Sequence, residues 1–203
     1  MRLTRLAAAA CLLSGSALAQ DRMPPLAPDQ LTPEQKAASE AFLAARKVPV
    51  FGPFVPLLRS PELMTSARAM GDYLRYRSAL PQRISEFVIL LTAREWTQDL
   101  EWKIHRPIAL KVGVAPDTVQ AVAEGRRPEH MSDEEDAAWS FTTELHRNRS
   151  VSDPTYAAAL SRFGEQGVMD MAGISGYYTL LAMTTNVART PPGEGPALPR
   201  LPD

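Results

Sequence analysis

The stretch of sequence that decides the fold runs from residue 81 to residue 113 and reads PQRISEFVILLTAREWTQDLEWKIHRPIALKVG. Its first half begins with Pro81, which suits the start of a helix, and continues with apolar side chains at helical spacing. Its second half begins near Asp99 and ends at Gly113, a residue typical of the position after a helix. A break near Trp96 or Thr97 therefore predicts two helices that can fold back on each other.

The chain on both sides of this stretch also has a helical pattern. Thr32 with Gln35, and Ser132 with Glu135, have the spacing of a capping box at a helix start. No run of alternating β-branched residues is long enough to suggest a strand, so the predicted fold class is all-α. Besides the two helices above, the expected helices cover residues 32–47, 61–74, 116–124, 132–146, 153–164 and 166–187.

The ends of the chain differ from the middle. Residues 1–19 contain two arginines, an apolar run and a small-residue cleavage pattern ending at Ala19, which predicts a secretory signal and a periplasmic or secreted protein. An uncleaved anchor and a lipid attached to Cys11 are the alternatives. We expect a proline-rich arm and first helix over 20–51 and a helical domain over 52–189. Residues 190–203 hold five prolines, which predicts a tail that wraps a neighbour or stays loose.

The composition narrows the possible functions. The chain has 203 residues, 45% of them hydrophobic and 22% charged, which is ordinary for a folded domain. With 22 basic and 23 acidic residues it offers no electrostatic reason to bind nucleic acid, and we expect no membrane partner after signal cleavage. Cys11 is the only cysteine, so signal cleavage would leave a chain without disulfides or thiol chemistry.

One group of residues could perform chemistry. Glu101 and His105 are four residues apart, so on a helix they share a face and the carboxylate can orient the imidazole. Pro107 should loosen the turn beside the histidine. Glu86 lies 19 residues before His105, and only a hairpin would let the two meet. Such a set suits a general acid and base, although a solvated Glu–His pair is the simpler interpretation.

The pattern resembles the carboxymuconolactone decarboxylase family, which shares its fold with the alkylhydroperoxidase D-like (AhpD-like) proteins. The resemblance extends from about Gly52 to Asn186. It implies an AhpD-like all-α fold with a central helical hairpin, assembled as trimers or hexamers. The residues that carry it are Glu86, Ile89, Leu90, Ala93, Glu101, Trp102, His105, Ala109 and Gly113.

The chain departs from the peroxidase branch of that fold. Gln98 and Glu101 stand where the Cys-x-x-Cys pair would be, so thiol-dependent peroxide reduction is disfavoured. The decarboxylase branch needs neither a thiol nor a cofactor, and it acts on a small carboxylated lactone. The resemblance implies His105 as the proton donor or acceptor, Glu101 as its orienting carboxylate and Glu86 as a second acid, base or relay.

Other residues near the hairpin are candidates for binding a small-molecule substrate. Trp96 and Trp102 could line a pocket or belong to the core, and Gln98 lies between them. Arg83 could hold a substrate carboxylate or be a surface charge. A metal could be imagined on Glu86, Glu101 and His105, but no second histidine is near in sequence, so we expect no metal and no cofactor.

The sequence thus favours a carboxymuconolactone decarboxylase-like lyase that performs cofactor-independent acid and base chemistry on a small carboxylated or lactone-like substrate. Decarboxylation or a related proton transfer would be the reaction. The alternative is a helical binding or assembly module of the same fold, in which Glu86 and His105 form a buried structural pair.

Overall fold

The computed structural model describes residues 20–201, so the predicted signal sequence over 1–19 lies outside the described residues. Within that range the chain forms helices and no strand, which confirms the predicted all-α class. A short 3-10 turn at Pro28–Gln30 precedes the helices. These are α1 (Pro33–Arg46), α2 (Phe54–Leu57), α3 (Pro61–Tyr76), α4 (Gln82–Glu95), α5 (Asp99–Lys111), α6 (Pro116–Ala123), α7 (Asp133–Asn148) and α8 (Asp153–Ala188).

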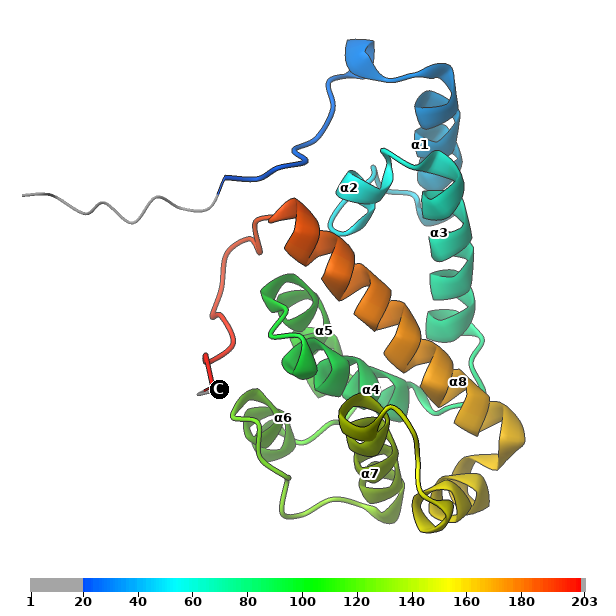
Figure 1. Cartoon of the computed structure of the whole chain (residues 1–203), viewed down its shortest axis with the longest axis vertical. Coiled ribbons are helices and arrows are strands. Elements are labelled where there is room, and N and C mark those ends of the chain that lie inside the picture. Colours follow the sequence, from blue (N-terminus) through cyan, green and yellow to red (C-terminus); the bar gives the residue numbers. More distant parts are fainter. Residues whose placement is uncertain (1–19, 202–203) are drawn as a thin grey trace, which may run out of the picture.

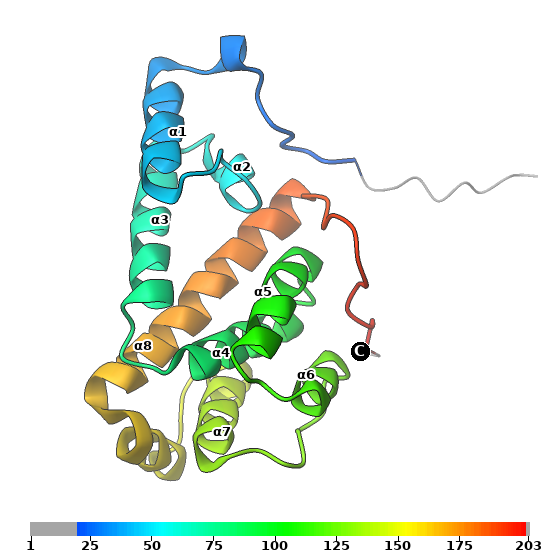
Figure 2. The same cartoon turned by 180° about the vertical axis from the view of Figure 1, so that it is seen from behind.

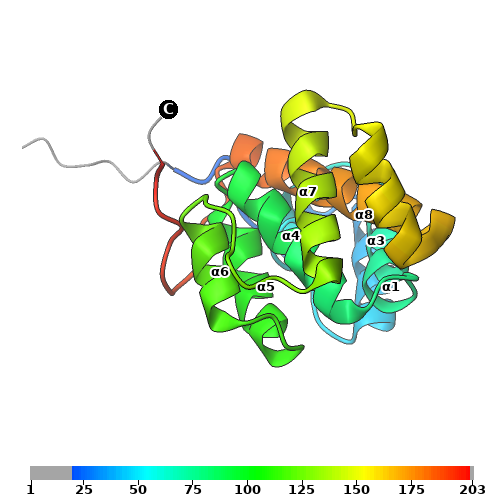
Figure 3. The same ribbon diagram turned by 90° about the horizontal axis from the view of Figure 1, so that it is seen from below.

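Helix α8 runs diagonally through the molecule and separates two groups of helices (Figure 1). Helices α1 and α3 pack against each other on one side of it, and the hairpin of α4 and α5 lies on the other (Figure 2). The view from below shows α7 against α4 and against the first part of α8 (Figure 3). Helix α4 is therefore enclosed by its neighbours.

The enclosure of α4 explains its sequence. Ile84, Phe87 and Val88 are fully buried, and the helix is apolar on nearly every face because α5, α6, α7 and α8 all pack against it. The chain then reverses at Thr97, whose φ of 46° is left-handed, and the side chain of Gln98 accepts a hydrogen bond from the Leu100 amide at 2.8 Å. The break predicted near Thr97 is confirmed.

Helix α8 consists of two parts. Gly164 has φ 65° and ψ 177°, which interrupts the helix and lets its first part turn away from the long second part. This agrees with the two helices predicted over 153–164 and 166–187. Both predicted capping boxes, at Thr32 and Ser132, are also present. The segment between α1 and α3 contains the short helix α2, which buries Phe54 and Leu57.

Both ends of the described chain pack on the chain itself. The amide of Arg22 donates to the carbonyl of Ala188 at 2.8 Å, so the N-terminal arm lies against the end of α8. The C-terminal tail runs beside α5 and α6 (Figure 1), and Leu198 is buried. The tail therefore packs on its own chain, whereas the sequence predicted that it would wrap a neighbour or stay loose. No helix of the described range is long and apolar enough to cross a bilayer.

Candidate functional site

The hairpin brings Glu86 and His105 into direct contact. His105 Nδ1 lies 2.7 Å from Glu86 Oε2, and both side chains are buried, with 2% of each residue exposed. A carboxylate accepts hydrogen bonds, so Nδ1 is the protonated ring nitrogen and Nε2 is left for other partners. The hairpin thus brings together two residues that are 19 positions apart in the sequence, and they form a buried acid–base pair.

Glu101 approaches the other ring nitrogen without binding it. Its Oε2 lies 3.7 Å from His105 Nε2, which is too long for a hydrogen bond, and its Oε1 is buried without a hydrogen-bond partner among the described residues. The carboxylate that orients His105 is therefore Glu86, and the role expected for Glu101 is corrected. Burial raises the pKa of Glu101, although His105 and Arg75 counteract this effect.

Helix α8 supplies an aromatic wall to the same site. The ring of Tyr178 meets that of His105 edge-on, with centroids 5.0 Å apart, and Tyr177 packs in the same way on Tyr178 at 5.2 Å. Burial raises the pKa of both phenols, so both stay protonated at physiological pH. Tyr177 also packs tightly against Gly71 of α3, where an added Cβ would lie 2.3 Å from the phenol oxygen.

Helix α3 contributes a cation. Arg75 Nε is buried without a hydrogen-bond partner among residues 20–201. Burial lowers the pKa of Arg75, but Tyr178, Tyr76, Glu86 and Glu101 together raise it by more, so the guanidinium stays charged. No ion pair within 4 Å joins Arg75 to any described carboxylate. The site thus contains a charged guanidinium whose Nε makes no hydrogen bond within the described residues.

These groups surround a small cavity of about 20 Å³. That volume holds about one water molecule. One wall of it, over residues 46–54, comes from the end of α1, the segment that follows and the start of α2, and Arg46 of this wall forms an ion pair with Asp72 at 2.7 Å. A small organic molecule would enter only if this wall moved. The lining residues are Arg46, Phe51, Pro53, Phe54, Arg75, Glu101, Ile104, His105, Tyr177, Tyr178 and Leu181.

The four residues predicted to bind substrate do not line this cavity. Trp102 is 3% exposed and belongs to the hydrophobic core, and the indole of Trp96 donates to Thr179 at 3.0 Å. Gln98 caps α5 and donates to Asn186 at 2.7 Å, while Arg83 forms ion pairs with α7. Nearness in sequence to the hairpin has therefore not placed these four side chains at the cavity beside His105.

Sequence reasoning missed Arg75 and the wall from residues 46 to 54. Arg75 lies in the last turn of α3, the helix before the one that carries Glu86, and no local pattern marks it as different from the surface arginines around it. Tyr177 and Tyr178 reach the cavity only through the packing of α8 against the rest of the fold. The hydrophobic pattern showed that α3 and α8 have a buried face, but it did not show which partner that face meets.

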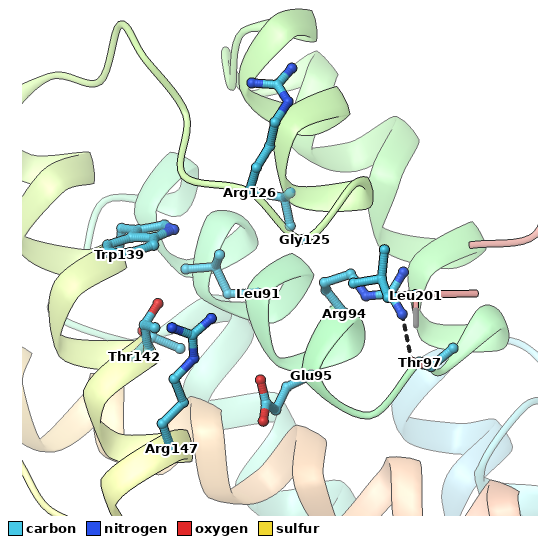
Figure 4. A pocket seen from close by; sticks show the side chains of 12 residues that line it. Leu91, Arg94, Glu95, Thr97, Gly125, Arg126, Trp139, Thr142, Arg147 and Leu201 are labelled. Atoms are coloured by element: carbon cyan, nitrogen blue, oxygen red, sulfur yellow. Dashed lines mark hydrogen bonds between the residues drawn. The ribbon is translucent and has the colours of Figure 1, made fainter. Parts of the chain in front are cut away.

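A second, larger cavity of about 290 Å³ lies between α4, α6, α7 and the tail (Figure 4). Its cationic side chains are largely committed elsewhere. Arg94 donates to the carbonyls of Ala123 and Pro199 and to Thr97 Oγ1, and Arg126 pairs with Glu124. Since no histidine lines it, this cavity lacks the acid–base pair found in the hairpin. Within the described residues, no group of three or more His, Cys, Asp or Glu side chains could hold a metal ion.

The hairpin, with a long last helix across it, defines the class of the protein: it has the all-helical AhpD-like fold. The chain is similar in structure to an uncharacterized peroxidase-related protein from Silicibacter sp. TM1040, with a TM-score of 0.67. The match covers 86% of this chain and 91% of that one at 13% sequence identity, so the likeness shows the fold alone. No family model matches the chain, and no curated protein matches it.

Proposed function

We propose that this protein catalyses cofactor-independent proton transfer on a small carboxylated or lactone-like molecule, with decarboxylation as the leading reaction. The observation that supports this most directly is the 2.7 Å contact between His105 Nδ1 and Glu86 Oε2 in a buried hairpin. A buried carboxylate on one ring nitrogen fixes the tautomer and stabilises the imidazolium that forms when the other nitrogen accepts a proton.

The proposed chemistry follows from the positions of the three groups. In a decarboxylation, the bond between the carboxylate carbon and its neighbour breaks, carbon dioxide leaves, and the electron pair stays on the neighbouring carbon as an enolate. His105 Nε2 or the neutral carboxyl of Glu101 then delivers a proton to that carbon. Glu86 keeps the imidazole ring in place throughout and compensates its charge.

The direct test measures carbon dioxide release from 4-carboxymuconolactone and a small panel of related lactones and β-keto acids. We expect release by the protein and a loss of at least about 100-fold in His105→Gln, which keeps the size of the side chain but cannot exchange protons in this range. His130→Gln, at an exposed histidine away from the hairpin, serves as the matched control and should keep full activity. Release that continues undiminished in His105→Gln would contradict the proposal.

The alternative proposal is a binding or assembly module that keeps the fold without catalysis. The small size of the cavity favours it, because only about one water molecule fits beside His105. In that case His105→Gln would disturb the buried Glu86 carboxylate and lower the free energy of unfolding by about 1–3 kcal/mol, with no activity to lose. The loss of stability follows from the buried contact in either case, so carbon dioxide release by the unmodified protein separates the two proposals, and urea unfolding measures what the pair contributes to stability.

Sustained peroxide turnover with a dithiol reductant would point to a third reaction, one that the absence of cysteine from residues 20–201 disfavours. Export to the periplasm or beyond, and work as a homo-oligomer, remain parts of the proposal. Cleavage after Ala19 is checked by N-terminal sequencing of the protein recovered from its native host.

A further inference from the structure

Three residues that line the small cavity beside His105 each have a buried polar atom without a hydrogen-bond partner in the described chain. These atoms are Arg46 Nε, from the end of α1, Arg75 Nε, from α3, and Glu101 Oε1, from α5. An unpaired buried donor or acceptor costs about 1–3 kcal/mol, so such groups are normally satisfied by a bound partner. Here the three atoms come from different helices and belong to residues that line the same space, which indicates a shared partner inside the cavity.

The two arginines of the cavity wall differ in what they can bind. Arg46 already has its charge met by Asp72 at 2.7 Å and lies over the rings of Phe42 and Phe54. Arg75 has no carboxylate within ion-pair distance among the described residues, although Glu86 and Glu101 lie near enough to influence its charge. Both guanidinium groups have an unpaired Nε, and Arg75 lies over the ring of Tyr76 at 5.3 Å, so the difference between the two arginines is that only Arg46 has a carboxylate partner.

We propose that Arg75 is the substrate-binding residue that receives a carboxylate of the substrate, with Glu101 as the second contact of the same group. This inference rests on the proposed function, because it names the substrate class for the same site. A planar guanidinium binds a carboxylate through two parallel hydrogen bonds, which a water molecule cannot reproduce. The neutral form of Glu101 donates its proton to a carboxylate oxygen and adds no second negative charge.

The charge balance of the site agrees with an anionic guest. Burial raises the pKa of Glu101, which reduces the repulsion that its carboxyl group would exert on a guest carboxylate. Two guanidinium groups line the cavity, and that of Arg46 is paired with Asp72. The guanidinium of Arg75, which has no carboxylate within ion-pair distance among the described residues, would therefore attract the guest carboxylate.

The test compares equilibrium binding of 5-oxotetrahydrofuran-2-carboxylate with that of its primary amide, which has nearly the same shape without the charge. Isothermal titration of the full protein needs no turnover, so it succeeds or fails independently of the decarboxylation assay. We expect the acid to bind more tightly than the amide, and Arg75→Gln to weaken acid binding about 10- to 100-fold while leaving amide binding nearly unchanged.

Arg77→Gln is the matched control, since Arg77 is an exposed arginine two residues further along and its loss changes the net charge equally. It should keep the preference for the acid. If Arg75→Gln does not fold by circular dichroism, Arg75→Lys replaces it and should lose most of the preference, because lysine lacks the planar fork. Equal binding of acid and amide, no binding of either, or an unchanged preference in the Arg75 variants would overturn the inference.

Three outcomes of the two assays taken together are informative. Charge-dependent binding that needs Arg75, without carbon dioxide release, keeps the carboxylate site and rejects the proposed reaction. If Arg75→Gln releases carbon dioxide with an unchanged KM, the proposed reaction is supported and the proposed binding role of Arg75 is contradicted. If Arg75→Gln lowers kcat alone and leaves binding unaffected, the binding role of Arg75 is also contradicted.

Discussion

At the scale of single residues, the two glutamates of the site differ in the hydrogen-bond partners that they have once they are buried. Glu86 and Glu101 are equally buried, yet only Glu86 has a hydrogen-bonded partner, in His105. A buried carboxylate with a close partner is stabilised as an anion, whereas one without such a partner is more stable when protonated. Two chemically identical side chains are thereby placed in different surroundings, one bound to the imidazole and the other without a hydrogen-bond partner among the described residues.

The raised pKa of Glu101 predicts a dependence of stability on pH. The unfolded carboxyl ionises around its ordinary value of 4.5, while burial keeps the folded one protonated to higher pH. The folded state therefore binds more protons, and stability falls as the pH rises above about 4.5 until the folded pKa is passed. Glu101→Gln cannot ionise, so its stability relative to the wild type should grow as the pH increases from about 4 to about 8.

Urea unfolding followed by circular dichroism at several pH values measures this difference. Glu129→Gln, at an exposed glutamate, is the control and should follow the wild-type curve. Curves for Glu101→Gln and the wild type that run parallel across the whole range would show that the buried carboxyl ionises normally.

Gly71 makes a second prediction at this scale. Replacing a helical glycine with alanine normally stabilises a helix by about 0.4–1 kcal/mol. At Gly71 the new Cβ would lie 2.3 Å from Tyr177 Oη, so Gly71→Ala should instead destabilise the protein by about 1–3 kcal/mol. Gly176 on α8 has open space around its Cβ position, and Gly176→Ala should give the usual gain. Thermal unfolding of both variants decides the matter, and a gain at Gly71 would mean that α3 and α8 are less tightly packed than described.

At the scale of elements, the reversal between α4 and α5 is fixed from outside by the C-terminal tail. Asp99, the first residue of α5, accepts a hydrogen bond from the Leu198 amide at 2.7 Å and forms an ion pair with Arg200 at 2.6 Å. Arg94 reaches the tail through the carbonyl of Pro199 at 2.7 Å. A segment that has no helix of its own thus ties together the two helices that carry Glu86 and His105.

We predict that Asp99→Ala lowers the free energy of unfolding by about 1–3 kcal/mol, because the buried amide of Leu198 loses its acceptor. Asp99→Asn keeps a carbonyl oxygen at the same place and should lose less. Chemical unfolding of the two variants measures the difference, and limited proteolysis should cut the tail faster in Asp99→Ala. Equal stability of Asp99→Ala and the wild type would show that the tail contributes nothing to the hairpin.

At the scale of the whole molecule, the described chain leaves apolar side chains exposed on α3. Leu63 and Met70 lie seven residues apart on the same face of this helix, and each is more than 40% exposed. A few exposed apolar residues are ordinary on a surface, but a row on one helix is typical of a subunit contact. We propose that this face of α3 takes part in the contact of the homo-oligomer, trimer or hexamer, that the resemblance of the sequence implies.

Sedimentation equilibrium of the purified protein should therefore give a mass of about three or six protomers. If α3 takes part in the contact, Met70→Glu should reduce that mass by placing a charge in an apolar interface. Lys36→Glu, at an exposed lysine on α1, is the control for an added negative charge. Arg68→Glu on α3 is unsuitable for this purpose because Arg68 forms an ion pair with Asp72. A monomer at all concentrations would remove oligomerisation from the proposal.

The sequence by itself determined the features that depend on neighbours along the chain. Helix starts at Thr32 and Ser132, the break near Thr97 and the interruption at Gly164 follow from capping side chains, backbone freedom and apolar spacing, all of which act over a few residues. The all-α class follows from the same signals. The spacing of Glu86 and His105 also indicated that a hairpin was needed for the two to meet.

Only the tertiary structure decided which side chains share a cavity. Arg75, Tyr178 and the wall from residues 46 to 54 come from three distant parts of the sequence, and packing alone brings them to His105. The same packing turned Trp102 into core and tied Arg83 to α7, against the roles predicted for them. The physical reason is that periodicity shows which face of a helix is buried, whereas the identity of its partner depends on contacts between residues far apart in the chain.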